Sequence, residues 1–167
     1  MSETRIYAAT PAEAGEISRL ASRIWRQVYP GIISTGQIEY MLEWMYAPEK
    51  IRSDIEEIGI TYLWIESNGA RRGYAAFGPD QEEEGTWLHK LYLEPELHRR
   101  GIGSAALVEI EKQVSRSGKG ELWLRVNRAN ESAIAAYLAN GFEIREERCS
   151  EIGNGFVMDD FIMVKTW

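Results

Sequence analysis

Cysteine is almost absent from this sequence, since Cys149 is the only one among 167 residues. One thiol cannot form an intramolecular disulfide or a cysteine-based metal cluster, which fits a reducing compartment. The sequence contains no run of about 18 apolar residues, which is the length that a membrane-spanning helix needs. Its first residues lack the apolar stretch of a signal peptide. We therefore expect a cytoplasmic protein that uses no metal and has no membrane partner.

Basic residues are also in short supply, with 19 Lys and Arg against 26 Asp and Glu and a formal net charge of -7. A nucleic-acid partner needs a net basic surface or at least a basic stripe, and no such stripe is present. A length of 167 residues with 44% hydrophobic content is typical of one globular domain. We therefore predict a single domain over residues 1–167 that does not bind nucleic acid.

Apolar periodicity divides the chain into strands and helices of a mixed α/β arrangement. The segment Thr10-Pro11-Ala12-Glu13 has an N-cap, an early proline and a capping-box glutamate, so it predicts a helix start. Asn68-Gly69 between two apolar runs predicts a hairpin. The predicted strands are 5–9, 60–66, 73–78, 86–93, 121–126, 142–149 and 156–165. The predicted helices are 10–28, one around 38–45, 48–58, 101–118 and 130–141.

A glycine-rich helix start after the strand 86–93 is the most informative segment. Gly101 and Gly103 open this helix, so its first backbone N–H groups can face a ligand where the helix dipole is positive. Neither glycine has a Cβ that would collide with a diphosphate, and Arg99 and Arg100 add positive charge beside it. This pattern predicts a phosphate-binding loop.

The same glycines also match the dinucleotide pattern G-x-G-x-x-A, which makes a dinucleotide-dependent oxidoreductase an alternative. In a dinucleotide fold the glycines follow the strand closely, and an acidic residue about 20 positions on holds the ribose. Here seven residues, 94–100, intervene, and the next strand ends in Arg125-Val126-Asn127. The context therefore disfavours a dinucleotide site.

Two blocks of this sequence resemble the motifs of the GNAT superfamily of acyl-CoA-dependent N-acetyltransferases. The family's pyrophosphate loop reads Gln/Arg-x-x-Gly-x-Gly/Ala, and residues 98–103 fit it except that His98 stands where Gln or Arg is usual. Residues 130–142 fit Asn-x-x-Ala-x-x-x-Tyr-x-x-x-Gly-Phe at each quoted position. The resemblance covers about 85–165 strongly, whereas 11–58 match only in helical content. The closing segment 152–165 looks like the bacterial polyamine-acetyltransferase-like branch.

The resemblance implies a GNAT-type fold and acetyl-CoA as cosubstrate. In such a fold the central sheet is mixed and mostly antiparallel, has a splayed strand pair, and is flanked by helices. The backbone of Leu91 and Leu93 would hold the pantetheine arm, and the Leu91 N–H would face the thioester oxygen. The implied coenzyme-binding residues are Leu91, Tyr92, Leu93, His98, Arg99, Arg100, Gly101, Ile102, Gly103, Ser104, Asn130, Ala133 and Tyr137.

Two residues are the predicted catalytic groups. By resemblance, Tyr137 faces the coenzyme sulfur and protonates the leaving thiolate. An amine is mostly protonated at neutral pH, so a base must take its proton, and His89 is the candidate. Alternation along the strand places four residues on one face: Trp87, His89, Leu91 and Leu93. A water chain leading to Glu82, Glu83, Glu84 or another acidic residue is the alternative base.

The acceptor is expected to be a small-molecule amine, and a polyamine is the preferred candidate. In the family the acceptor pocket usually forms from the loop between the first two helices, joined by the closing hairpin. Those segments hold several aromatic and acidic side chains: Trp25, Tyr29, Tyr40, Met41, Trp44, Phe156 and Asp159 or Asp160. A protein or peptide amine, and a non-catalytic acyl-CoA sensor, stay open as alternatives. A homodimer is an open expectation too.

Overall fold

The computed structural model describes residues 3–167 and is built on one seven-stranded sheet with the order β1-β2-β3-β4-β5-β7-β6. Every neighbouring pair is antiparallel except β4 and β5. The strands are β1 (Thr4–Ala8), β2 (Thr61–Ser67), β3 (Ala70–Pro79), β4 (Thr86–Leu93), β5 (Glu121–Asn127), β6 (Glu143–Gly153) and β7 (Phe156–Thr166). The helices are α1 (Ala14–Val28), α2 (Thr35–Tyr46), α3 (Pro48–Ser53), α4 (Ile102–Arg116) and α5 (Glu131–Ala139). The predicted α/β class and mostly antiparallel sheet are confirmed.

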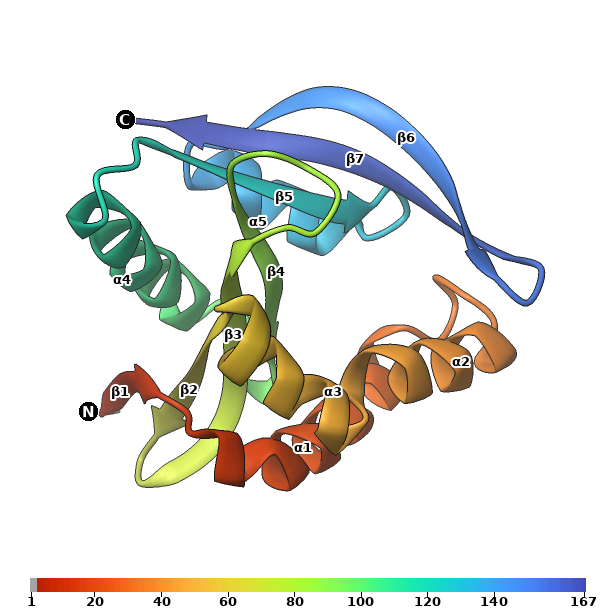
Figure 1. Cartoon of the computed structure of the whole chain (residues 1–167), viewed down its shortest axis with the longest axis horizontal. Helices are drawn as coiled ribbons and strands as arrows, with labels where there is room; N and C mark the ends of the chain where they lie inside the picture. The colour runs from red at the N-terminus through yellow and green to blue at the C-terminus, as the bar shows by residue number, and fades with distance from the viewer. Residues whose placement is uncertain (1–2) are drawn as a thin grey trace.

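Helices cover both faces of the sheet (Figure 1). The apolar sides of α1, α2 and α3 pack with β2 and β3 residues such as Trp64 and Tyr74 in one core. The apolar side of α4 packs with Leu122 and Leu124 of β5 in a second core, and Tyr137 of α5 lies against it. The sheet is therefore the middle of three layers. No helix in the described range 3–167 is long and apolar enough to cross a membrane.

Local signals set most of the element ends. Glu13 closes the predicted capping box, because its carboxylate accepts the Thr10 N–H at 2.8 Å. Asn68 and Gly69 both have positive φ, of 51° and 81°, and form the predicted hairpin turn. Several predicted bounds were inexact, and β3 for example begins at Ala70 rather than at residue 73. The segment 48–58 is not one α-helix, because α3 ends at Ser53 and a π-helical turn follows over Asp54–Ile58. The closing strands also extend beyond the predicted 142–149 and 156–165.

Strands β4 and β5 separate soon after they meet. They pair only at Trp87↔Trp123 and Leu88↔Leu124. On its other side β4 pairs with β3 at seven positions, and β5 pairs with β7 at seven. Each strand is thus held by its outer neighbour while the inner edges diverge. This confirms the expected splayed strand pair.

A β-bulge at His89 changes which β4 residues share a face. Phe77 of β3 lies opposite Leu88, whereas Ala76 lies opposite Lys90, so His89 is the extra residue. Leu88 and Leu91 consequently both pack on the α4 side, although they are three residues apart. The prediction that Trp87, His89, Leu91 and Leu93 share one face is therefore wrong. Because one residue is inserted, simple alternation along the strand no longer predicts which face a side chain is on.

Close packing of β3 on the end of β4 gives a first test of the fold. A Cβ on Gly73 would lie 2.5 Å from Leu93 Cδ2 and 2.7 Å from the Tyr92 carbonyl oxygen. We expect Gly73→Ala to lower the free energy of unfolding by about 1–3 kcal/mol, measured by urea denaturation. The reason is that the Tyr92 carbonyl oxygen belongs to the backbone and cannot move without distorting the strand. Gly15→Ala in α1 is the control, since its Cβ would meet only Arg19 Nη1 at 3.4 Å. Equal stability of the two variants would contradict this packing.

Candidate active site

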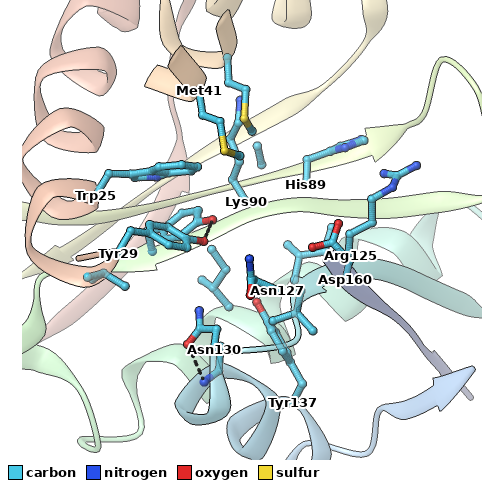
Figure 2. Close-up of a pocket in the computed structure, with 18 of the residues that line it drawn as sticks. Trp25, Tyr29, Met41, His89, Lys90, Arg125, Asn127, Asn130, Tyr137 and Asp160 are labelled. Carbon is cyan, nitrogen blue, oxygen red and sulfur yellow. Dashed lines mark hydrogen bonds between the residues drawn. The ribbon is translucent and has the colours of Figure 1, made fainter. Parts of the chain in front are cut away.

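A cleft of about 1500 Å³ runs through the gap between β4 and β5. Its walls include Gly103 and Tyr137 on the α4 and α5 side of the sheet. They also include Trp25 of α1 and Met41 of α2 on the opposite side (Figure 2). The cleft therefore connects the two faces of the sheet, and ligands entering from each face can meet inside it.

The inner edge of β4 offers backbone groups to this cleft. The Glu94 N–H donates to the Arg72 carbonyl, so residue 94 directs its backbone toward the β3 side. Successive residues of a strand point their N–H and C=O groups to opposite edges. Leu91 and Leu93 therefore direct theirs toward β5, where β4 has no strand partner beyond Leu88 in residues 3–167. Such an edge can bind an extended amide-containing chain as an added strand.

The start of α4 forms a second polar wall of the cleft. Gly101 is the N-cap with φ of +77°, a conformation that favours glycine, and the first-turn N–H groups have no carbonyl partner within the helix. Gly101, Gly103, Ser104 and Arg99 line the cleft. Such a helix start is suited to a phosphate group.

The structure gives the side-chain positions of three residues predicted to bind the coenzyme, which the sequence alone does not predict: His98, Ile102 and Arg100. His98 lines the cleft and donates from Nε2 to the Leu93 carbonyl at 3.0 Å, so its ring ties the loop to the end of β4. The Ile102 side chain is buried against Leu93 and Leu97, which leaves only its backbone for a ligand. Arg100 is exposed and does not line the cleft.

Tyr137 reaches the cleft from α5, opposite the β4 edge (Figure 2). Its ring packs edge-on against Phe142, with centroids 5.5 Å apart. Burial, with a smaller contribution from Tyr29, raises the pKa of the Tyr137 hydroxyl, so it stays protonated at neutral pH. Asn130 caps α5 by accepting the Ala133 N–H at 3.3 Å, and both residues line the cleft.

His89 lines the cleft on the α1 and α2 side. Its Nε2 donates to the Pro79 carbonyl at 2.9 Å, and its Nδ1 lies 3.9 Å from Asp80 Oδ1. Asp80 also forms an ion pair with Arg125 at 3.1 Å. Burial lowers the pKa of His89, although Pro79 and Asp80 oppose this shift. The ring is thus a neutral side chain with one nitrogen held by the backbone.

Aromatic rings form the wall of the cleft on the α1 side. Trp25 packs against Tyr29 and Tyr92, with centroid separations of 4.5 and 5.5 Å. The Tyr29 and Tyr92 hydroxyls lie 2.8 Å apart. Burial raises the pKa of Tyr29 to about 12, and the nearby Asp160 carboxylate contributes to this shift. The predicted acceptor residues Trp25, Tyr29 and Met41 are therefore brought together at the cleft.

Only one of the two predicted acidic residues faces the cleft. Asp160 of β7 lines it and is 5% exposed. Its neighbour Asp159 is exposed and lies 3.7 Å from Arg128 in an ion pair. Burial raises the pKa of Asp160 to about 6, and Asp159 adds to this, whereas Arg125 and Arg148 oppose it.

Lys90 is a cleft residue that the sequence analysis missed. It is 6% exposed and donates to the Tyr62 hydroxyl at 2.6 Å, which in turn donates to Asp54 at 3.2 Å. Lys50 also pairs with Asp54. Burial lowers the pKa of Lys90 to about 8, while the Asp54 charge opposes this. The adjacent polar pair His89-Lys90 inside an apolar strand was the available signal, because it marks the bulge.

The described residues suit an acyl thioester coenzyme. The free β4 edge, the helix start at Gly101 and the Tyr137 hydroxyl lie along one cleft. They offer groups for amides, phosphates and a leaving sulfur, in that order. Within residues 3–167, no three His, Cys, Asp or Glu side chains are grouped as metal ligands would be.

Comparison with known proteins finds N-acetyltransferases among those similar to this chain. The model of the acetyltransferase (GNAT) family matches residues 21–142. The spermidine N(1)-acetyltransferase of Thermoplasma acidophilum is 28% identical over 144 residues, which cover 84% of this chain and 86% of that protein. The crystal structure of the PaiA N-acetyltransferase from Thermoplasma acidophilum in complex with coenzyme A has a TM-score of 0.80 at 26% identity, over 99% of both chains.

A third similarity is shorter. The [ribosomal protein bS18]-alanine N-acetyltransferase of Escherichia coli is 34% identical over 55 residues, which are 33% of this chain and 37% of that protein.

The phosphate-binding role of the helix start at Gly101 can be tested by placing a larger side chain at Gly103. A Cβ on Gly103 would have only Leu93 Cδ1 within 4 Å, at 3.8 Å, so a side chain fits the fold. We expect Gly103→Val to weaken acetyl-CoA binding in calorimetric titration by roughly 10-fold or more, because the branched side chain crowds the phosphates. Gly103→Ala should lie between Val and wild type. Unchanged affinity in folded Gly103→Val protein would place the phosphates elsewhere.

Proposed function

Because this chain belongs to the acetyltransferase (GNAT) family, we propose that it transfers the acetyl group of acetyl-CoA to a primary amine of a small molecule, and that this amine is a polyamine. The supporting observation is the continuity of the cleft. It joins the β4 edge and Tyr137 on one side of the sheet to Trp25, Tyr29 and Asp160 on the other. Donor and acceptor can therefore approach the same point from opposite faces.

Backbone groups hold the coenzyme in this proposal. The Leu91 and Leu93 edge binds the pantetheine amides as a neighbouring strand would, and the start of α4 binds the diphosphate. The Leu91 N–H donates to the thioester oxygen and stabilises the negative charge that develops there. These backbone donors are fixed before the ligand arrives, so little reorganisation is needed during the reaction.

Tyr137 acts as the general acid. As the amine nitrogen bonds to the acetyl carbon, the carbon–sulfur bond breaks and the phenol gives its proton to the leaving sulfur. The raised pKa of Tyr137 keeps the phenol protonated until a thiolate appears beside it. Asn130 holds the start of α5 and so fixes the direction of the Tyr137 side chain.

The acceptor side of the cleft suits an alkyl amine with more than one positive charge. Met41 and Trp25 give it apolar walls, against which methylene groups can pack. Asp160 gives a buried negative charge, and Glu151 lines the same cleft. The similarity to a spermidine N(1)-acetyltransferase supports the same substrate class.

Several titratable groups line the cleft, including Glu82 and Glu151, and the two candidates for accepting the ammonium proton are His89 and Asp160. His89 stays the sequence-based prediction for this role. If it is the base, the rate rises with pH through its own titration, and His89→Gln removes that limb of the profile. Their different surroundings make the two candidates separable by experiment.

The acid role of Tyr137 gives a kinetic prediction. Tyr137→Phe keeps the ring packed on Phe142 but removes the proton donor. We expect kcat in a thiol-release assay to fall by roughly 100-fold, with little change in acetyl-CoA affinity. Tyr7→Phe on β1 is the control, because its hydroxyl bonds Glu66 away from the cleft. If Tyr137→Phe keeps its kcat while thiolate departure limits the rate, the acid is another group.

The acceptor class is tested by comparing two amines. We expect kcat/KM for spermidine to exceed that for a neutral-tailed monoamine of similar length, because the cleft carboxylates favour a second cation. Added salt should raise the apparent KM for spermidine, since the screening length falls to about 3 Å near 1 M. A peptide with a free N-terminal alanine completes the panel. Preference for the monoamine or the peptide would reject the polyamine while leaving the transfer reaction in place.

A further inference from the structure

Asp160 lies at the level of the acetyl-binding edge of β4. It pairs with Asn127 across β5 and β7, and Asn127 lies three residues beyond the last β4–β5 pair at Leu124. Leu91 lies two pairing levels beyond Leu88, the β4 member of that pair, because the bulge at His89 adds one residue to β4. The carboxylate of Asp160 therefore projects into the cleft where the two strands have just diverged (Figure 2).

This carboxylate has no ion-pair partner within 4 Å among the residues that the structure describes. Each of the two arginines near it forms an ion pair with another carboxylate. Arg125 pairs with Asp80 at 3.1 Å, and Arg148 pairs with Glu83 at 2.6 Å. A buried carboxylate is normally paired or hydrogen-bonded. A buried carboxylate that has no such partner and faces a cleft can bind a cationic ligand.

Hydroxyl groups lie around the same point. The Asp160 charge raises the pKa of Tyr29, and Tyr29 in turn raises that of Tyr137, so these groups lie within electrostatic range of one another. The Tyr29 hydroxyl bonds that of Tyr92 at 2.8 Å. Tyr29, Tyr137 and Asp160 all line the same cleft.

We propose that Asp160 binds the ammonium group of the acceptor and takes its proton directly, before the nitrogen attacks the thioester. This inference rests on the proposed function. The ammonium gives one proton to the carboxylate, which later releases it to solvent. The nitrogen then bonds to the acetyl carbon and loses its second proton to solvent as the carbon–sulfur bond breaks, while Tyr137, after giving its proton to the sulfur, is reprotonated from solvent. That second proton balances the one that Tyr137 gives to the sulfur.

His89 is less suited to direct proton transfer. Because its Nε2–H is held by the Pro79 carbonyl, only Nδ1 can accept a proton, and Nδ1 faces Asp80 at 3.9 Å. The Asp80 carboxylate is already paired with Arg125. The geometry therefore assigns these three side chains to the wall of the cleft and leaves Asp160 as the open proton acceptor.

The protonation of Asp160 suits this role near neutral pH. Burial and Asp159 raise its pKa to about 6, against the opposing charges of Arg125 and Arg148, and Tyr29 is the titratable group facing it from α1. Above this pH the group is ionised and can accept a proton, and below it the group is already protonated. Activity limited by Asp160 therefore rises with pH through about 6 and then levels off.

The experiment compares Asp160→Asn with Asp159→Asn as the matched control, since Asp159 is the adjacent exposed carboxylate. Thiol release with spermidine is followed over about pH 5–9, and we expect Asp160→Asn to lose roughly 100-fold or more in kcat/KM together with the rising limb. Asp159→Asn should keep the limb and stay within about threefold. Calorimetry should give both variants wild-type affinity for acetyl-CoA, which also shows that they are folded.

A binding measurement gives a second readout. In protein labelled with carboxyl-¹³C aspartate, saturating spermidine should lower the pKa of the Asp160 carboxyl, because the bound ammonium favours the charged form. An unchanged titration overturns the proposal, as does an Asp160→Asn enzyme that keeps both the limb and the rate. Loss of the limb in His89→Gln alone would return the role to His89. If wild-type protein releases no thiol with any amine, the proposed function itself fails.

Discussion

The divergence of β4 from β5 is the constraint on which the rest of this site depends. The two strands share only two paired positions, yet each is paired along its outer side, apart from the bulge at His89 in β4. The sheet can therefore stay open at its centre without losing the ladders that stabilise it. An open inner edge leaves backbone groups of Leu91 and Leu93 without a strand partner, and of these the Leu93 carbonyl accepts a hydrogen bond from His98. The same opening lets the cleft pass from one face of the sheet to the other.

Charge compensation differs among the acidic residues of this cleft. Asp80 is neutralised by Arg125, and Asp54 by Lys50 and the Tyr62–Lys90 hydrogen-bond chain. Asp160 is buried to a similar degree without such a partner. An unpaired buried charge lowers stability, so the position of Asp160 in the cleft fits the proposed catalytic role better than a role in folding.

Much of the fold was predictable because its signals are local. The capping box at Thr10, the turn at Asn68-Gly69 and the N-cap Asn130 act over three or four residues and appear in the structure as expected. The splayed strands were expected only through the family resemblance, because no local sequence pattern predicts that two neighbouring strands diverge. The bulge at His89 was missed, since it depends on how β3 pairs with β4.

The sequence alone determined which chemical groups were available: a glycine-opened helix start, a tyrosine on a capped helix, and a pair of aspartates in the last strand. Tertiary structure decided which of them face the cleft. Asp159 and Asp160 are adjacent in sequence, and only the register of β7 on β5 directs Asp160 inward and Asp159 to solvent. The physical reason is that alternate residues of a strand point to opposite faces, so a one-residue shift in a long-range pairing exchanges their roles.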